Sequence, residues 1–181
     1  IVAAITLAFA IYLLSELVNK PQLNESTNPV FTQEEKIFTP LKALNEVFEK
    51  RDLAHAVSIS IEKAKVRIHK DPLQFNINSA RNGYVYLLMV GTNQTDFYLL
   101  FPNNLDQQNR IESGTPLSLP RDEWKMLASG PPGINHFVIM VSDNPRDFSS
   151  AGLSNYYPFA KFPFQQARAL YLNYEDNNLA L

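Results

Sequence analysis

Three histidines are the residues of this sequence best suited to metal binding or proton transfer. His55, His69 and His136 are far apart along the chain, and none belongs to a His-x-x-x-His pair or a mixed-ligand cluster of the kind that holds zinc. The sequence contains no cysteine, which excludes disulfides and thiolate metal sites. We therefore predict neither a metal centre nor a cofactor.

Nucleophilic and phosphate-binding motifs are also missing. No serine lies in a Gly-x-Ser-x-Gly sequence. The stretch Gly130-Pro131-Pro132-Gly133 resembles a phosphate loop only superficially, because such loops bind anions through backbone N–H groups and proline has none. Gly130–Gly133 is expected to be a tight turn. The 181 residues of this sequence are expected to have no enzymatic activity. Surface ion pairs are predicted between the carboxylates and guanidinium groups of the following residues: Asp96, Asp143 and Asp147 with Arg81, Arg110 or Arg146.

The segment Tyr156–Phe164 has more aromatic side chains than a plain surface loop requires. The candidate protein-interaction residues are Tyr156, Tyr157, Phe159 and Phe162. Two interpretations remain open. The segment either folds back over a sheet and closes its core, or it presents an exposed recognition patch of aromatic anchors.

The strands that would have to position these side chains are found at 83–90, 97–101 and 136–141. Large apolar residues occupy both alternating faces of each strand, instead of the single face expected of a half-solvated strand. Burying one such side chain stabilises the fold by roughly 1.5–3 kcal/mol. We therefore expect central strands with a core on one face and a helix, a loop or a partner on the other. In 97–101, strict alternation places Phe97, Leu99 and Phe101 on one face.

Around these strands the pattern predicts two short helices and several strands with a single apolar face. Thr39-Pro40 is a typical helix start, and apolar residues follow it at helical spacing. Strands of alternating pattern are predicted at 57–61, 65–69 and 73–78, shorter ones beyond Pro102, and a short helix at 164–172. The expected fold class is mainly β, with sandwich-like antiparallel sheets, an N-terminal transmembrane or apolar helix, and one or two short covering helices.

The N-terminal part has a different composition. Residues 1–14 are continuously apolar, and we predict that 1–18 is the C-terminal part of a transmembrane helix, followed by a tether at 19–38 and a globular domain at 39–181. A signal-peptide core and a buried helix are the alternatives. Because the flank after the apolar run has only one basic residue, Lys20, the globular part is expected outside the cytoplasm.

Overall charge argues against nucleic acid as a partner. The chain of 181 residues has a formal net charge of −2, so it offers no general attraction to a phosphate backbone. Its length and its 45% hydrophobic residues suffice for one sizeable core.

A series of motifs resembles the bacterial domain of unknown function 4384 family over about residues 73–148. They are Asn78-Ser79-Ala80-Arg81-Asn82-Gly83-Tyr84-Val85-Tyr86, Leu100-Phe101-Pro102-Asn103, Asn109-Arg110-Ile111 with Gly114, Leu119-Pro120 with Trp124, Gly130-Pro131-Pro132-Gly133, Phe137, Val141-Ser142 and Pro145-Arg146-Asp147-Phe148. The resemblance implies attachment to Ser/Thr protein kinase or caspase-like peptidase domains, often beyond a single membrane span. It defines no catalytic residues.

Together these observations predict a non-catalytic sensing or protein-docking module. It would be anchored in a bacterial inner membrane by one span, with its globular part in the periplasm. It resembles the region that follows the membrane span of a bacterial Ser/Thr kinase, although no kinase signature is present in these residues. The alternative is a structural subunit of a bacterial envelope or secretion assembly.

Overall fold

The computed structural model describes residues 37–153 and 157–179. The described residues from Phe38 onward belong to one compact unit. Within them, no helix has both the length and the apolar character needed to cross a membrane. The transmembrane helix predicted for 1–18, and the tether up to residue 36, lie outside the described residues. Phe38, the last residue of the predicted tether, is buried and its ring contacts those of Phe164 and Tyr171.

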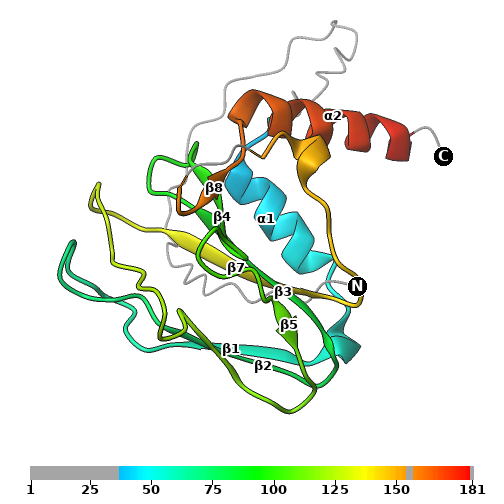
Figure 1. Cartoon of the computed structure of the whole chain (residues 1–181). Coiled ribbons are helices and arrows are strands. Elements are labelled where there is room, and N and C mark those ends of the chain that lie inside the picture. The colour runs from blue at the N-terminus through cyan, green and yellow to red at the C-terminus, as the bar shows by residue number, and fades with distance from the viewer. Residues whose placement is uncertain (1–36, 154–156, 180–181) are drawn as a thin grey trace, which may run out of the picture. The chain divides into compact units, whose positions relative to one another are not determined.

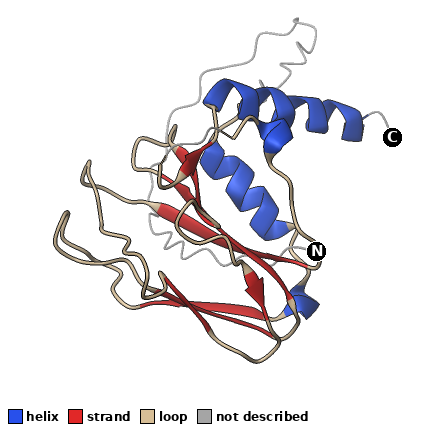
Figure 2. Cartoon of the chain, viewed as in Figure 1, coloured by secondary structure: helices blue, strands red, loops and turns tan. Residues whose placement is uncertain are grey.

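The fold is mainly β with antiparallel sheets and two α-helices, which confirms this part of the predicted class (Figures 1 and 2). The helices are α1 (Pro40–Glu49) and α2 (Phe164–Leu179), with two short 3-10 turns at Leu53–His55 and Ser149–Ala151. The strands are β1 (Val57–Ile61), β2 (Phe75–Ser79), β3 (Gly83–Val90), β4 (Phe97–Phe101), β5 (Arg110–Ile111), β6 (Leu117–Leu119), β7 (His136–Ser142) and β8 (Ala160–Lys161).

Two antiparallel sheets are formed. The smaller has the order β1-β2-β6. In the larger, β3 is the central strand, and it pairs with β7 along most of its length. Tyr84 pairs with both Arg110 and Ser142, and Leu87 with both Phe101 and Ile139. Therefore β4 and β5 share the edge of β3 that is opposite β7, and β8 extends the sheet beyond β4.

The first hydrophobic core lies between the two sheets. From the smaller sheet it receives Phe75 and Ile77 of β2 with Leu117 and Leu119 of β6. From the larger sheet it receives the following residues: Val85, Leu87, Leu100, Phe101, Ile139 and Val141. β2 therefore has one apolar and one solvent face, because Asn76 and Asn78, between its buried residues, are exposed.

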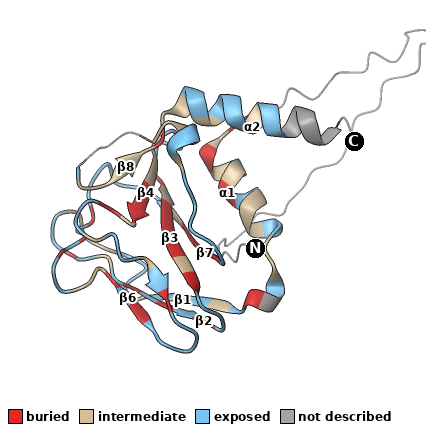
Figure 3. Cartoon of the chain, turned by 45° about the vertical axis from the view of Figure 1, so that its right-hand side comes forward, coloured by how far each residue is buried: buried red, intermediate tan, exposed pale blue. Residues whose placement is uncertain are grey.

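The second core covers the other face of the larger sheet. Tyr86, Leu88 and Val90 of β3 belong to one buried cluster there with Leu44 of α1, and Phe162 is also a member. This confirms the expectation that the central strands are covered on both faces, with α1 as one cover (Figure 3). α1 begins as predicted, since the Thr39 hydroxyl accepts a hydrogen bond of 3.0 Å from the backbone N–H of Lys42, and Pro40 occupies the first turn.

The predicted faces of β4 need one correction. Phe97 and Leu99 face the second core as expected, but Phe101 belongs to the first core together with its neighbour Leu100. The cause is a β-bulge, since the pairing of Leu87 with Phe101 and of Leu88 with Leu99 leaves Leu100 as an extra residue. Strict alternation along the sequence cannot anticipate such an insertion.

The strand predicted at 65–69 is wrong, and this segment is a loop ending in a turn. One carboxylate oxygen of Asp71 accepts hydrogen bonds from the backbone N–H of Arg67, at 2.7 Å, and from its Nε, at 3.0 Å. His69 has a φ of 58°, which no strand residue adopts. A side chain that captures a backbone donor in this way competes directly with strand pairing.

Candidate functional site

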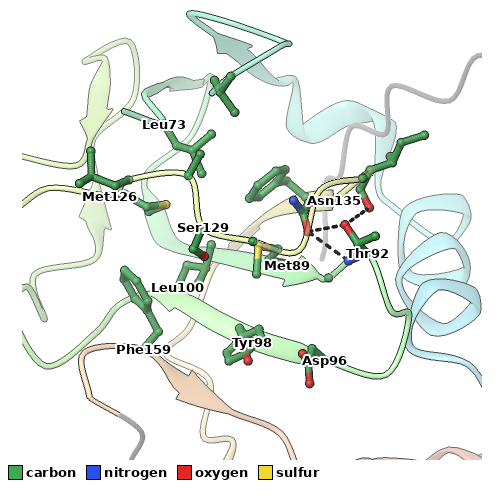
Figure 4. A pocket seen from close by; sticks show the side chains of 18 of the residues that line it. Leu73, Met89, Thr92, Asp96, Tyr98, Leu100, Met126, Ser129, Asn135 and Phe159 are labelled. Carbon is green, nitrogen blue, oxygen red and sulfur yellow. Dashed lines mark hydrogen bonds between the residues drawn. The ribbon is translucent and has the colours of Figure 1, made fainter. Parts of the chain in front are cut away.

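A pocket of about 660 Å³ lies at the end of the larger sheet where β3 and β4 are joined. Its lining comes from four separate segments. These are 61–66 with Leu73, 89–100, 126–137 and 157–159. Figure 4 shows apolar side chains, including Leu73, Met126 and Phe159, gathered toward one end and the polar side chains of Thr92 and Asn135 at the other.

The apolar part of the pocket continues the first core. Leu100 and Met126 are buried core residues that also line the pocket, and Met89, Tyr98 and Phe137 pack against the same core. Met89, Tyr98, Leu100 and Phe137 belong to β3, β4 and β7, so the larger sheet positions most of the floor. Two of the protein's three methionines lie here, and the flexible thioether side chain adapts to ligands of different shape.

One wall is formed by two loops joined through their backbones. The N–H of His69 donates to the carbonyl of Ala128 at 2.8 Å, Ala128 donates to Asp71 at 3.2 Å, and Leu73 donates to Met126 at 2.7 Å. An isolated bridge between Pro72 and Leu127 lies in the same stretch. This pairing holds Leu73 and Met126 at the pocket although they are distant in sequence.

The opposite end is held by Thr92, in the turn between β3 and β4. Its N–H donates to Asn135 Oδ1 at 3.1 Å, and its hydroxyl donates to the carbonyl of Ile134 at 3.3 Å (Figure 4). Gly133 has a φ of 151°, and a Cβ there would lie 2.2 Å from the Thr92 methyl carbon. Only glycine allows this close approach.

The carboxylate at the rim is neutralised by its neighbour. Asp96 forms an ion pair with Lys161 of β8 and accepts a hydrogen bond of 2.8 Å from Asn93 Nδ2. The hydrogen bond from Lys161 lowers the pKa of Asp96, and Asp96 in turn raises the pKa of Lys161. Asp96 is therefore ionised and paired at neutral pH, which makes it a poor general base.

Positive charge is concentrated on the loop that carries the other rim. Lys63 and Lys65 line the pocket. The Lys63 ammonium lies 3.9 Å from Asp71 Oδ1, but that carboxylate already receives three hydrogen bonds from Arg67. The side-chain bonds from Arg67 hold the pKa of Asp71 well below its usual range. Within the described part of the chain, Lys65 is exposed and makes no ion pair.

The aromatic residues singled out in the sequence have different environments. Tyr157 is 69% exposed at the pocket mouth, and Phe159 is half-buried against the first core and also lines the pocket. Phe162 is only 4% exposed and stacks on Phe97 with ring centroids 4.5 Å apart. Tyr156 lies outside the described residues. Thus Phe159 and Phe162 close the cores, while Tyr157 presents its ring to solvent.

The histidines are not brought together, and the described residues contain no group of three or more metal-ligating side chains. His136 is on β7 and His69 is in the turn before Asp71. His55 is fully buried and neither ring nitrogen has a hydrogen-bond partner, although its Nε2 lies 3.5 Å from a carboxylate oxygen of Asp143. His55 lies in the first 3-10 turn, on the expected link between a helix, α1, and a strand, β1.

The predicted aspartate–arginine pairs are wrong. Asp96 pairs with Lys161, Asp143 lies beside His55, and Asp147 accepts hydrogen bonds from the N–H and hydroxyl of Ser149. Sequence reasoning missed the pocket altogether, because its lining converges only through contacts between distant loops. Two signals were available in the sequence: the aromatic surplus of 156–164, from which Tyr157 and Phe159 line the pocket, and the basic composition of 62–70, of which alternation led us to predict 65–69 as a strand.

The match to a known family covers the centre of this structure. No curated protein and no solved structure matches the chain. The sequence model of the family described as "Domain of unknown function (DUF4384)" matches residues 68–145, close to the predicted 73–148. This segment supplies the pocket floor and the wall around Met126, whereas Lys63, Lys65 and Tyr157 lie outside it. Residues 68–145 of this chain are therefore a domain of the DUF4384 family.

Proposed function

We propose that the globular part of this chain is a non-catalytic protein-docking module and that the pocket receives an anchor from the partner. The single observation that carries this proposal is a preformed apolar pocket whose mouth is itself apolar. Among the described residues, eight large apolar side chains are exposed, and three of these line the pocket. They are Leu127, Ile134 and Tyr157, exposed to 50%, 73% and 69%.

An apolar rim of this kind suits a macromolecular partner better than a small molecule. A small ligand is mostly enclosed by its pocket and would leave these three side chains in water. A protein segment that inserts one anchor and covers the rim would bury them as well, and such buried anchors dominate the energy of interfaces. Tyrosine is enriched among them, and Tyr157 lies on the rim.

Catalysis is not supported by the polar groups in the pocket. Asp96 is held ionised by Lys161, and Thr92 is engaged with Asn135 and the carbonyl of Ile134. A nucleophile needs a neighbouring base in hydrogen-bond reach. Ser129, the serine in the lining, has no such hydrogen bond among the bonds found in the described residues. We therefore assign binding rather than chemistry to this site.

The cellular setting is proposed from the sequence alone. The apolar run at 1–14 supports a single span in a bacterial inner membrane, and the weakly basic flank supports a periplasmic position for the domain. Docking would influence an attached Ser/Thr kinase only if the partner bound two states of the protein with different affinities. Sequencing of the gene upstream of the Ile1 codon tests the attachment to a kinase, because a kinase domain encoded there must contain the Gly-rich loop, His-Arg-Asp and Asp-Phe-Gly motifs.

Site-specific photocrosslinking tests the docking proposal. A photoreactive phenylalanine analogue replaces Ser129, which is exposed and lines the pocket, in the full chain expressed in its own cells. The matched control places the same analogue at Thr115, which is exposed but outside the lining. We expect discrete protein adducts from position 129 that are missing from position 115. Equal labelling at both positions, or no protein adduct at 129, contradicts docking at the pocket.

A further inference from the structure

We infer that the docked segment carries an apolar anchor flanked by acidic residues. This inference rests on the docking function proposed above and specifies the partner. It comes from the two kinds of side chain around the pocket. The apolar lining favours an apolar anchor, and the rim lysines, Lys63 and Lys65, favour acidic residues next to that anchor. The partner is thus a protein segment with glutamate or aspartate next to a large aliphatic or aromatic side chain.

The positive charge of the rim is not cancelled locally. Two acidic groups near the pocket are already engaged: Asp71 is bound by Arg67 through both carboxylate oxygens, and Asp96 is paired with Lys161. Lys63 is the second cation beside Asp71, at 3.9 Å, and Lys65 has no ion pair among the described residues. The Lys65 ammonium is therefore available for a carboxylate brought by the partner, and the Lys63 ammonium, which shares Asp71 with Arg67, can donate to that carboxylate as well.

The loop that carries Lys63 and Lys65 adds further positive charge beside the pocket. Between residues 62 and 71 the basic residues are Lys63, Lys65, Arg67 and Lys70, against Glu62 and Asp71 as the acidic ones. The local excess is positive although the whole chain has a net charge of −2. Such a patch steers acidic segments toward the pocket and disfavours basic ones, since like charges across an interface are repelled.

The shape of the pocket sets the other half of the specificity. A volume of about 660 Å³ falls within the range of pockets that enclose a ligand of drug size, which allows a large side chain with part of its backbone. Met89 and Met126 can adjust around different anchors. Selectivity among apolar side chains is accordingly expected to be loose, while selectivity for flanking charge is strict.

A peptide-display library tests the inference. The immobilised full chain is used to select from random peptides at low ionic strength, and the enriched sequences are compared with the starting library. We expect enrichment of large apolar residues with neighbouring acidic residues. For one enriched peptide, the double variant Lys63→Glu with Lys65→Glu should weaken binding about fivefold to thirtyfold, the size expected for reversing two exposed charges. Raising the salt concentration should weaken wild-type binding more than that of this variant.

The matched control reverses two arginines that are far from the pocket. Arg81 and Arg110 are exposed near the start of β3, where Arg110 pairs with Tyr84, about 20 Å from the pocket end of this strand. Arg81→Glu with Arg110→Glu makes the same change in net charge as the lysine double variant. This control should bind like the wild type.

The possible outcomes separate the two proposals. Apolar peptides that bind without acidic enrichment, and equally well to both double variants, overturn the inference and leave docking intact. No enrichment at all, or binding that persists in Ser129→Trp, in which the new side chain occupies the pocket, overturns the docking function and the inference with it.

Discussion

Replacing Phe162 by alanine should destabilise the fold strongly, because this side chain is one of the links between the C-terminal segment and the second core. Phe162 is 4% exposed and contacts Phe97 and Phe148, with ring centroids 4.5 and 5.8 Å away. Truncation of a buried phenylalanine costs about 3–5 kcal/mol, including the cavity left behind. We expect the upper part of this range, since both aromatic contacts are lost as well.

The assay is urea unfolding of the full chain followed by the fluorescence of Trp124, which lies in the first core. The midpoint should fall with little change in slope, and thermal unfolding should occur about 6–20 °C lower for a protein of this size. The matched control is Tyr157→Ala. It removes another aromatic residue of the same segment, but one that is 69% exposed, and should change stability by about 0.5 kcal/mol or less. A loss below about 1 kcal/mol for Phe162→Ala, or equal losses for both variants, would refute the assignment of Phe162 to the core.

Two further predictions concern local hydrogen bonds. Thr39→Ala removes the acceptor for the Lys42 N–H and should cost about 0.5–2 kcal/mol in urea unfolding, whereas Thr39→Ser keeps the hydroxyl and should cost much less; equal costs would contradict the capping role. Asp71→Asn removes a carboxylate whose pKa is lowered mainly by hydrogen bonds from Arg67. In the wild type this carboxylate stabilises the fold fully above the pKa of aspartate in the unfolded chain, roughly 3.9, and the stabilisation is lost as the pH falls below that value. Acid titration of stability should therefore show a smaller decrease between about pH 4 and pH 2 in the variant than in the wild type, and identical curves would exclude a role for this pair.

The parts of the fold that could be predicted are those decided by local pattern. β3 and β7 have apolar residues on both faces, which requires cover on both, and the structure provides it through two cores. Thr39 and Pro40 specify the start of α1 through hydrogen bonding and a fixed φ, both of which depend on neighbouring residues only.

The parts that failed depend on contacts between distant residues. The bulge that moves Phe101 to the first core follows from its pairing with Leu87. The hydrogen bond from Thr92 to Asn135 joins residues 43 positions apart, and the local sequence of neither segment predicts this contact. The candidate site therefore could not be assembled from the sequence, although Phe159 and Tyr157 were singled out and do line it.

The position of the family segment within the two cores has a practical consequence for dissecting this protein. A piece cut at residues 68 and 145 would keep β2 to β7 but would lose Leu44 and Phe162, so the face of β3 formed by Tyr86, Leu88 and Val90 would be uncovered. Large exposed apolar faces make a protein prone to aggregate. Expression of the isolated segment should accordingly give aggregates, and the smallest autonomous folding unit must extend from Thr39 into α2.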